Sequence, residues 1–170
     1  MVYAIIAVIL LIADQWLKYW VTVNITLATG SEALIPGVVK LVNIHNSGAA
    51  FGLLDGVSYA RWIFLGIAAV MVVLIVVLLV RRTFDSKFAV WCEVLFLAGA
   101  LGNCIDRIFR GYVVDMFDLQ FMDYPIFNLA DIFVVVGVIL GAVYYLWFYD
   151  KYDKRSGKEP GDDTAADSHK

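Results

Sequence analysis

The sequence predicts an all-α membrane protein with four transmembrane helices and a small extracytoplasmic sheet. Of its 170 residues, 62% are hydrophobic and only 17% are charged, whereas soluble domains average about 45–50% and about 25%. The apolar residues are concentrated in four blocks, at residues 2–23, 59–80, 88–108 and 127–147. Each block has close to the ~20 residues that a helix needs to cross a ~30 Å hydrocarbon core. Lipid offers no partner for open backbone groups, so helices are the expected conformation.

The first block is expected to stay in the protein rather than to be removed as a signal peptide. No basic region precedes it, and no small-residue cleavage site follows it. Its second half also contains Asp14, Gln15 and Lys18, which an ordinary apolar signal segment would lack. The block is therefore interpreted as the first membrane span.

Basic residues predict the orientation of the four spans. Eight of the thirteen lie in the loop after the second block or in the C-terminal tail: Arg81, Arg82, Lys87, Lys151, Lys154, Arg155, Lys158 and Lys170. By the positive-inside rule, both termini and this loop are cytoplasmic, and residues 24–58 and 109–126 face outward. Residues 1–150 are expected to form one membrane-embedded domain, and residues 151–170 a polar, disordered cytoplasmic tail.

The first outer segment has strand-like features. Val38–Asn46 is rich in β-branched residues, and the run from Asn46 to Gly52 contains Asn, Ser and Gly, which favour a turn. This pattern predicts a small sheet on the outer side of the membrane.

Polar side chains from three blocks and one outer loop fall at the same depth, near the outer interface. They are Asp14, Lys18, Asn103, Arg107, Asp115, Asn128 and Asp131. A charge at the centre of a bilayer costs at least ~2.5–3.5 kcal/mol, so such residues face a protein interior or water. Their convergence at one level predicts a functional site.

Some of these polar residues also have a structural interpretation. Lys18 is expected to extend outward to the interface, with Asp14 as its partner four residues away on the same helix face. Arg110 is expected to be an interfacial anchor, and Asn128 is a natural N-cap for the fourth span. For Arg107, one turn beyond Asn103, a role in the site is favoured over anchoring.

The remaining polar or small residues are interpreted structurally. Asp118 and Asp123 are expected to be solvated in the outer loop, and Glu93 to reach water at the cytoplasmic end of the third span. His45 is expected to be a structural or solvated loop residue. Gly137 and Gly141 form a GxxxG pattern, which is typical of a helix-packing face.

Asp115 and Asp131 are the strongest catalytic candidates, because both lie between apolar residues at the depth of the polar layer. Burial and proximity separate the pKa values of two carboxyl groups, so that one holds a proton while the other is ionised. The ionised group can deprotonate water while the protonated one polarises a carbonyl, which suffices to hydrolyse a peptide bond. The sequence does not decide which aspartate acts as the base.

No metal or other cofactor is expected. The chain has two histidines, His45 and His169, and neither a CxxC nor an HExxH motif, which argues against a zinc site. Cys92 and Cys104 are twelve residues apart on one helix, about 18 Å, which is too far for a disulfide. The serines Ser47, Ser58 and Ser86 have no membrane-embedded histidine to activate them.

Four segments, in order, make the chain resemble the lipoprotein signal peptidases, the type II signal peptidases of bacteria. The segments are DQWLK (Asp14–Lys18), NSGAAFG (Asn46–Gly52), GNCIDRIFRGYVVD (Gly102–Asp115) and FNLAD (Phe127–Asp131). Each motif alone is weak, but four in this order on a four-span layout are specific. The resemblance covers about residues 5–150. Met116, where the family more often has Phe, and the long acidic tail are small departures.

The resemblance implies a function and a set of site residues. It implies a monomeric aspartyl endopeptidase of the bacterial inner membrane that cleaves prolipoproteins just before a diacylglyceryl-modified cysteine, with its active site near the outer leaflet. It places the catalytic pair at Asp115 and Asp131. Residues of the same motifs are expected to shape the site or bind substrate: Asp14, Lys18, Asn46, Gly48, Gly102, Asn103, Asp106, Arg107, Asn128 and Ala130. It also implies inhibition by cyclic peptides such as globomycin and an outer β-cradle with a short surface helix.

Three other functions fit the pattern less well. A transporter or proton channel would place polar residues through the whole membrane depth, whereas here they stay on one side. A scaffold subunit leaves the pair Asp115 and Asp131 unexplained. A phosphate-handling membrane enzyme would need more cationic groups than Arg107 and Lys18, and usually a histidine. No feature indicates nucleic-acid binding.

Overall fold

Four long helices form the body of the protein. The computed structural model describes residues 1–48, 59–81, 83–84 and 86–152. The helices are α1 (Val2–Asn24), α2 (Ala60–Arg81), α3 (Lys87–Phe109), α4 (Leu129–Trp147) and the short α5 (Tyr149–Tyr152). By length and composition, α1 to α4 could each cross a membrane, so the four predicted spans are confirmed. The last one begins at Leu129, because Phe127 pairs with a strand and Asn128 caps the helix.

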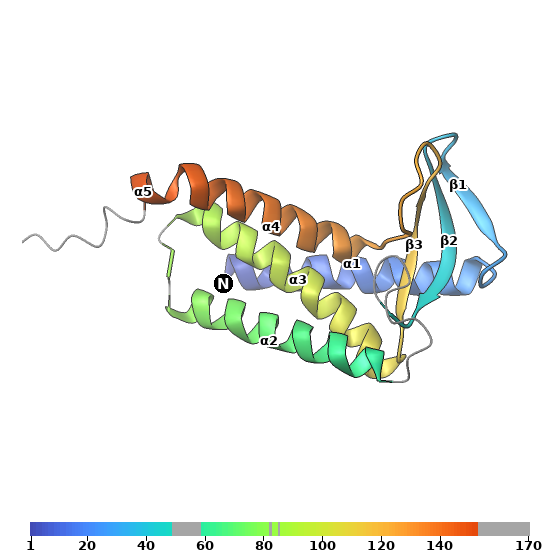
Figure 1. The fold of residues 1–170 in the computed structure, drawn as a ribbon, viewed down its shortest axis with the longest axis horizontal. Coiled ribbons are helices and arrows are strands. Elements are labelled where there is room, and N and C mark those ends of the chain that lie inside the picture. Colours follow the sequence, from blue (N-terminus) through green and yellow to red (C-terminus); the bar gives the residue numbers. More distant parts are fainter. Residues whose placement is uncertain (49–58, 82, 85, 153–170) are drawn as a thin grey trace, which may run out of the picture.

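Helix α3 lies at the centre of the bundle and packs against α1, α2 and α4 (Figure 1). In the described chain, no Cα atom of α2 lies within 8 Å of a Cα atom of α4, and both helices pack on α3. Both Met1 and α5 lie at the end of the bundle that is farther from the sheet (Figure 1). The predicted tail beyond Tyr152 lies outside the described residues.

A three-stranded antiparallel sheet caps the other end of the bundle (Figure 1). Its strands are β1 (Ser31–Ile35), β2 (Val39–Asn46) and β3 (Val113–Leu119), in that order. The sheet is therefore confirmed, and β2 corresponds to the predicted strand-like segment. Asp115, which we expected in a loop, lies on β3 opposite Ile44 of β2. The described parts of the outer segments contain no surface helix, and residues 49–58 lie outside the description.

A buried apolar cluster attaches the sheet to the last turns of α1. It consists of Val21, Ile25, Leu41, Val114 and Met116. The side-chain amide of Asn43 on β2 also donates a hydrogen bond of 2.9 Å to the carbonyl oxygen of Ile25. These contacts fix the position of β3, and with it Asp115, relative to the helices.

A glycine on α4 allows the close approach of α3 and α4. A Cβ atom at Gly137 would lie 2.9 Å from the carbonyl oxygen of Cys92 and 2.9 Å from the backbone nitrogen of Phe96. Because real Cβ atoms are not found this close to backbone, a larger residue would separate α4 from α3. The packing role predicted for the GxxxG pattern is confirmed at this position.

Candidate active site

Two aspartates and one asparagine form the centre of the site. The side-chain amide of Asn128 donates a 2.7 Å hydrogen bond to Asp115 Oδ1. Its backbone N–H donates a 3.1 Å bond to Asp131 Oδ2, and its Oδ1 accepts from the backbone N–H of Asp131. Asn128 therefore holds both carboxyl groups at once and keeps them beside each other.

Local structure explains this arrangement. Phe127 exchanges backbone hydrogen bonds with Phe117 on β3, which draws the chain before α4 alongside the strand that carries Asp115. Asn128 is then the N-cap of α4, and Asp131 at the third helical position completes a capping box. The predicted N-cap role of Asn128 is confirmed, and the cap also places Asp131 next to the strand.

Two further asparagines complete the contacts of the pair. Asn46 Nδ2 donates to Asp115 Oδ2 at 2.8 Å, and Asn46 Oδ1 accepts from the backbone N–H of Gly48. Asn103 Nδ2 donates to Asp131 Oδ1 at 2.7 Å. All four carboxylate oxygens thus accept a hydrogen bond from a neutral N–H group.

The two carboxyl groups line a cavity of about 330 Å³. Its walls come from β2, α3, β3, the segment before α4 and α4 itself: Asn46, Asn103, Arg107, Val113, Asp115, Tyr124, Pro125, Ile126, Phe127, Asp131 and Val135. Among the residues that the structure describes, neither Asp115 nor Asp131 forms an ion pair. The cavity therefore brings together two carboxyl groups whose hydrogen-bond donors are neutral, and the Arg107 side chain lines the same cavity.

The environment of Asp115 favours its protonated form. Asp115 is buried, with only 3% of its surface exposed. Burial raises the pKa of Asp115 to about 6, and the nearby Asp131 carboxyl group acts in the same direction, against the hydrogen bonds from Asn46 and Asn128. A carboxyl group of this kind keeps its proton up to about pH 6 and can donate it within the cavity.

A second buried cluster supports the pair from α1. Lys18 is 0% exposed, and its ammonium group lies 2.9 Å from Asp14 Oδ2 and 3.0 Å from Asp106 Oδ2. Its third proton is directed to Asn103 Oδ1 at 3.0 Å. Because that bond fixes the amide of Asn103, the opposite end of the same amide points to Asp131. Lys18 therefore acts on the pair through one intervening residue.

Other sequence-predicted residues also join this network. Asp14 Oδ1 accepts from the backbone N–H of Ala130 at the start of α4. A Cβ atom at Gly102 would lie 2.6 Å from Asp14 Oδ2, so glycine leaves room for that carboxylate. Arg107 donates to the carbonyl oxygen of Gly48 and stacks over the ring of Phe64 on α2. The structure thus brings together all twelve predicted site residues.

Several structural expectations were wrong. Lys18 does not extend outward to the interface, because three buried acceptors hold it inside the bundle. Arg110 pairs with Asp106 at 2.9 Å, and its role as an interfacial anchor stays a prediction. Glu93 is 7% exposed and does not reach water as expected. His45 lies on β2 rather than in a loop, stacked on Tyr112 at 3.7 Å, and burial lowers its pKa.

Sequence reasoning also missed Gln15. Its amide donates to Asp14 Oδ2, to Asp106 Oδ1 and to the carbonyl oxygen of Gly102, which ties α1 to α3. A polar amide inside an otherwise apolar span was the signal for such a role. No group of three His, Cys, Asp or Glu residues suited to a metal ion occurs in the described chain.

The chain is similar to known membrane peptidases over most of its length. The family model for signal peptidase (SPase) II matches residues 6–147. A lipoprotein signal peptidase of Enterococcus faecalis is 40% identical over 161 residues, covering 93% of this chain and 92% of the relative. One from Streptococcus thermophilus is 42% identical over 144 residues, covering 84% and 90%.

Solved structures share the fold. A bacterial membrane enzyme determined by the in meso method at 2.3 Å resolution superposes with a TM-score of 0.77 at 32% identity, covering 93% of each chain. Another, at 1.9 Å resolution, has the same TM-score at 33% identity, covering 86% of this chain and 94% of the other. The chain belongs to the signal peptidase II family.

Proposed function

We propose that this protein is an aspartyl endopeptidase that removes signal peptides from prolipoproteins, cleaving before a diacylglyceryl-modified cysteine. The observation that carries the proposal is the cavity in which Asp115 and Asp131 lie together, each held by asparagine donors. Membership of the signal peptidase II family supports the substrate class. The resemblance supports the position of cleavage.

In the proposed reaction, Asp115 and Asp131 share one proton and activate one water. The ionised carboxylate takes a proton from the water while the water oxygen bonds to the carbonyl carbon of the scissile bond. The protonated carboxyl group gives its proton to the carbonyl oxygen, which produces a neutral tetrahedral intermediate. As the C–N bond breaks, the carboxyl group that took the water proton gives it to the leaving nitrogen, and the other carboxylate takes a proton back from a hydroxyl group of the intermediate. The products are a carboxylic acid and a new amino-terminal cysteine, and the pair again holds one proton.

The surrounding asparagines keep the pair ready for this proton exchange. Asn46, Asn103 and Asn128 each donate a hydrogen bond to a carboxylate oxygen. Such donors stabilise the ionised form of the pair, whereas burial and mutual repulsion favour the proton that the acid needs. The opposed effects hold one proton on two carboxyl groups.

The membrane explains how this substrate reaches the site. The acyl chains of the modified cysteine contribute ~0.8 kcal/mol per buried CH₂ and so remain in the lipid. An apolar signal peptide is also held by the bilayer, and both can approach the cavity laterally. The scissile bond is then presented near the interface, where water is available.

The orientation belongs to the same proposal. Arg81 and Lys87 flank the turn between α2 and α3, at the end of the bundle away from the sheet. The positive-inside rule makes that end cytoplasmic, so that Met1 and α5 are cytoplasmic and the sheet lies on the outer side. The site then faces the outer leaflet of the cytoplasmic membrane.

A cleavage assay with purified protein in detergent tests the proposal. The substrates are a diacylglyceryl-modified prolipoprotein and its unmodified precursor. We expect cleavage of the modified form alone, and its loss in Asp115→Asn and Asp131→Asn. Asp118→Asn is the matched control, because Asp118 lies on the same strand but pairs with Lys40 at 3.1 Å outside the cavity. Equal activity of all variants would remove Asp115 and Asp131 from the reaction.

A further inference from the structure

A buried carboxyl group at the opposite end of the bundle has no role in the proposed reaction. Glu93 lies on α3, ten residues before Asn103, which is about 15 Å along the helix. Its side-chain Oε1 is buried and has no hydrogen-bond partner among the described residues. A buried polar atom without a partner costs free energy, so a ligand that satisfies it would bind favourably.

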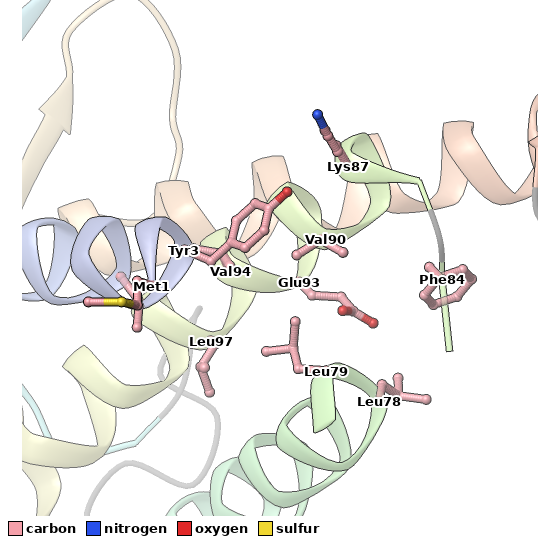
Figure 2. Close-up of a pocket in the computed structure, with 12 residues that line it drawn as sticks. Met1, Tyr3, Leu78, Leu79, Phe84, Lys87, Val90, Glu93, Val94 and Leu97 are labelled. Carbon is pink, nitrogen blue, oxygen red and sulfur yellow. The ribbon is translucent and has the colours of Figure 1, made fainter. Parts of the chain in front are cut away.

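Two cavities meet at this side chain. One, of about 610 Å³, lies among α1, α2 and α3 and contains the Glu93 carboxylate near Leu78, Leu79 and Phe84 (Figure 2). The other, of about 250 Å³, lies among α2, α3 and α4. Both are lined mainly by apolar side chains. Lys87 lies at the edge of the larger cavity, but its ammonium group points away from Glu93 (Figure 2).

The smaller cavity and the aspartate cavity lie along the same faces of α3 and α4. On α3, Phe96 of one cavity is seven residues before Asn103 of the other, which is two helical turns. On α4, Val135 and Val138 are three residues apart, one in each cavity. The two cavities thus follow one another along the same faces of α3 and α4, with Asp131 in one and Glu93 in the other, and we call this stretch the groove.

The length and charge of this groove fit one occupant. A signal peptide has a basic n-region followed by an apolar stretch of about 7–15 residues, or roughly 10–22 Å as a helix. The ~15 Å between the levels of Asn103 and Glu93 falls within that range. With the apolar stretch in the groove, a long basic side chain of the n-region reaches the depth of Glu93.

We propose that Glu93 binds a lysine or arginine side chain from the basic n-region of the signal peptide, with the apolar part of the peptide in the groove. The inference rests on the proposed function and orientation. The charged side chain would satisfy Glu93 Oε1 with a charge-assisted hydrogen bond. Arg81 and Lys87 are exposed and free to contact anionic lipid. Glu93 thus selects for the charge of the signal peptide far from the scissile bond.

The test compares two diacylglyceryl-modified prolipopeptides that differ only in the n-region, one with lysines and one with glutamines. We expect Glu93→Gln to raise KM for the lysine peptide about tenfold with kcat unchanged. For the glutamine peptide, the same variant should give the KM of the unchanged enzyme. Glu32→Gln, at an exposed position on β1, is the matched control and should alter neither KM. Charge reversal, with Glu93→Lys and a glutamate n-region, should restore the low KM.

Other outcomes would overturn the inference. Equal changes for both peptides in Glu93→Gln would mean that Glu93 acts only in packing. The assay is repeated with the protein in lipid vesicles of varied ethanolamine-lipid content. If KM follows that lipid content and not the n-region charge, the ligand of Glu93 is a lipid headgroup. Failure of the unchanged enzyme to cleave either peptide would refute the proposed function instead. Binding of the two peptides, measured without cleavage, would then still decide whether Glu93 recognises the charge.

Discussion

Replacement of Lys18 by methionine tests whether the buried cation organises the site. Methionine preserves most of the side-chain length but removes the charge that lies 2.9 Å from Asp14 and 3.0 Å from Asp106. At an effective dielectric constant of ~20, each such pair contributes about 4 kcal/mol of Coulomb energy, most of which offsets desolvation. Removal of one partner from a buried pair costs about 3–5 kcal/mol. We therefore expect Lys18→Met to lower the free energy of unfolding by ~4 kcal/mol.

The cost arises from uncompensated charge, so a second substitution should recover part of it. In Lys18→Met, Asp106 keeps its pair with Arg110, whose side chain is 28% exposed, whereas Asp14 loses the one cation with which it pairs among the described residues. Asp14→Asn removes one of those negative charges while its side-chain oxygen can still accept from the backbone N–H of Ala130. The double variant should therefore be more stable than Lys18→Met alone, by about 1–3 kcal/mol.

Catalysis should respond in a different way. Without Lys18, Asn103 Oδ1 loses its donor, and the amide is no longer held with Nδ2 towards Asp131. We expect kcat to fall by about ten- to a hundredfold, and the double variant not to recover it. Unfolding by SDS titration in mixed micelles gives the stabilities, and cleavage of the lipidated substrate gives kcat. A loss of stability under ~1 kcal/mol, or no gain from Asp14→Asn, would refute this account of the cluster.

Three further predictions concern stability and are measured by the same unfolding titration. Because the pKa of Asp115 is raised from 3.8 to about 6, the folded state keeps a proton that the unfolded chain releases. The free energy of unfolding of the protein should therefore fall by up to ~3 kcal/mol as the pH rises from about 4 through 6. Asp115→Asn should abolish this part of the pH dependence. Asn128→Ala should cost about 1–2 kcal/mol, because it removes the N-cap of α4 and the bond to Asp115. Gly102→Ala should cost about 1–3 kcal/mol, because its Cβ would lie 2.6 Å from Asp14 Oδ2 and 3.1 Å from Ala130 Cβ.

Matched variants separate these effects from general damage. Asn24→Ala removes an asparagine whose amide bonds only a local carbonyl, that of Trp20 on the exposed end of α1, and should cost less than Asn128→Ala. Gly66→Ala adds a Cβ that meets nothing within 4 Å, and should be neutral or slightly stabilising. Equal losses at Gly66 and Gly102 would contradict the packing argument. If the free energy of unfolding depends on pH in the same way in the unchanged protein and in Asp115→Asn, Asp115 does not carry the proton assigned to it.

The membrane spans could be predicted because their signal is strong and local. Twenty apolar residues in a row have few alternatives to a transmembrane helix, and the bounds of α1 differ from the prediction by one residue. The beginning of α4 was predicted less well, because Phe127 is as apolar as the helix that follows. Its place is set by the pairing with Phe117, a contact between residues that sequence periodicity does not connect.

The pairing of charges inside the bundle could not be predicted from position in the sequence. Asp106 lies on α3, 88 residues after Lys18, and only the packing of α1 on α3 brings the two to 3.0 Å. The prediction that Lys18 extends outward considered only its own helix, where Asp14 is the sole neighbour of opposite charge. Helical spacing finds partners on one element, whereas buried charges in a bundle are matched between elements.

Charge matching also explains why this chain keeps so many aspartates at the end of the bundle that carries the sheet. Asp14 and Asp106 are compensated by Lys18 and Arg110, and their oxygens are occupied by backbone and side-chain donors. Asp115 and Asp131 receive hydrogen bonds from asparagines, which position a carboxyl group without supplying a positive charge. A carboxylate in contact with a buried cation is held in an ion pair, whereas Asp115 and Asp131 line a cavity with only neutral donors on their oxygens. The same residue type therefore belongs to a structural ion-pair cluster in one place and to the acid–base pair that we propose in the other.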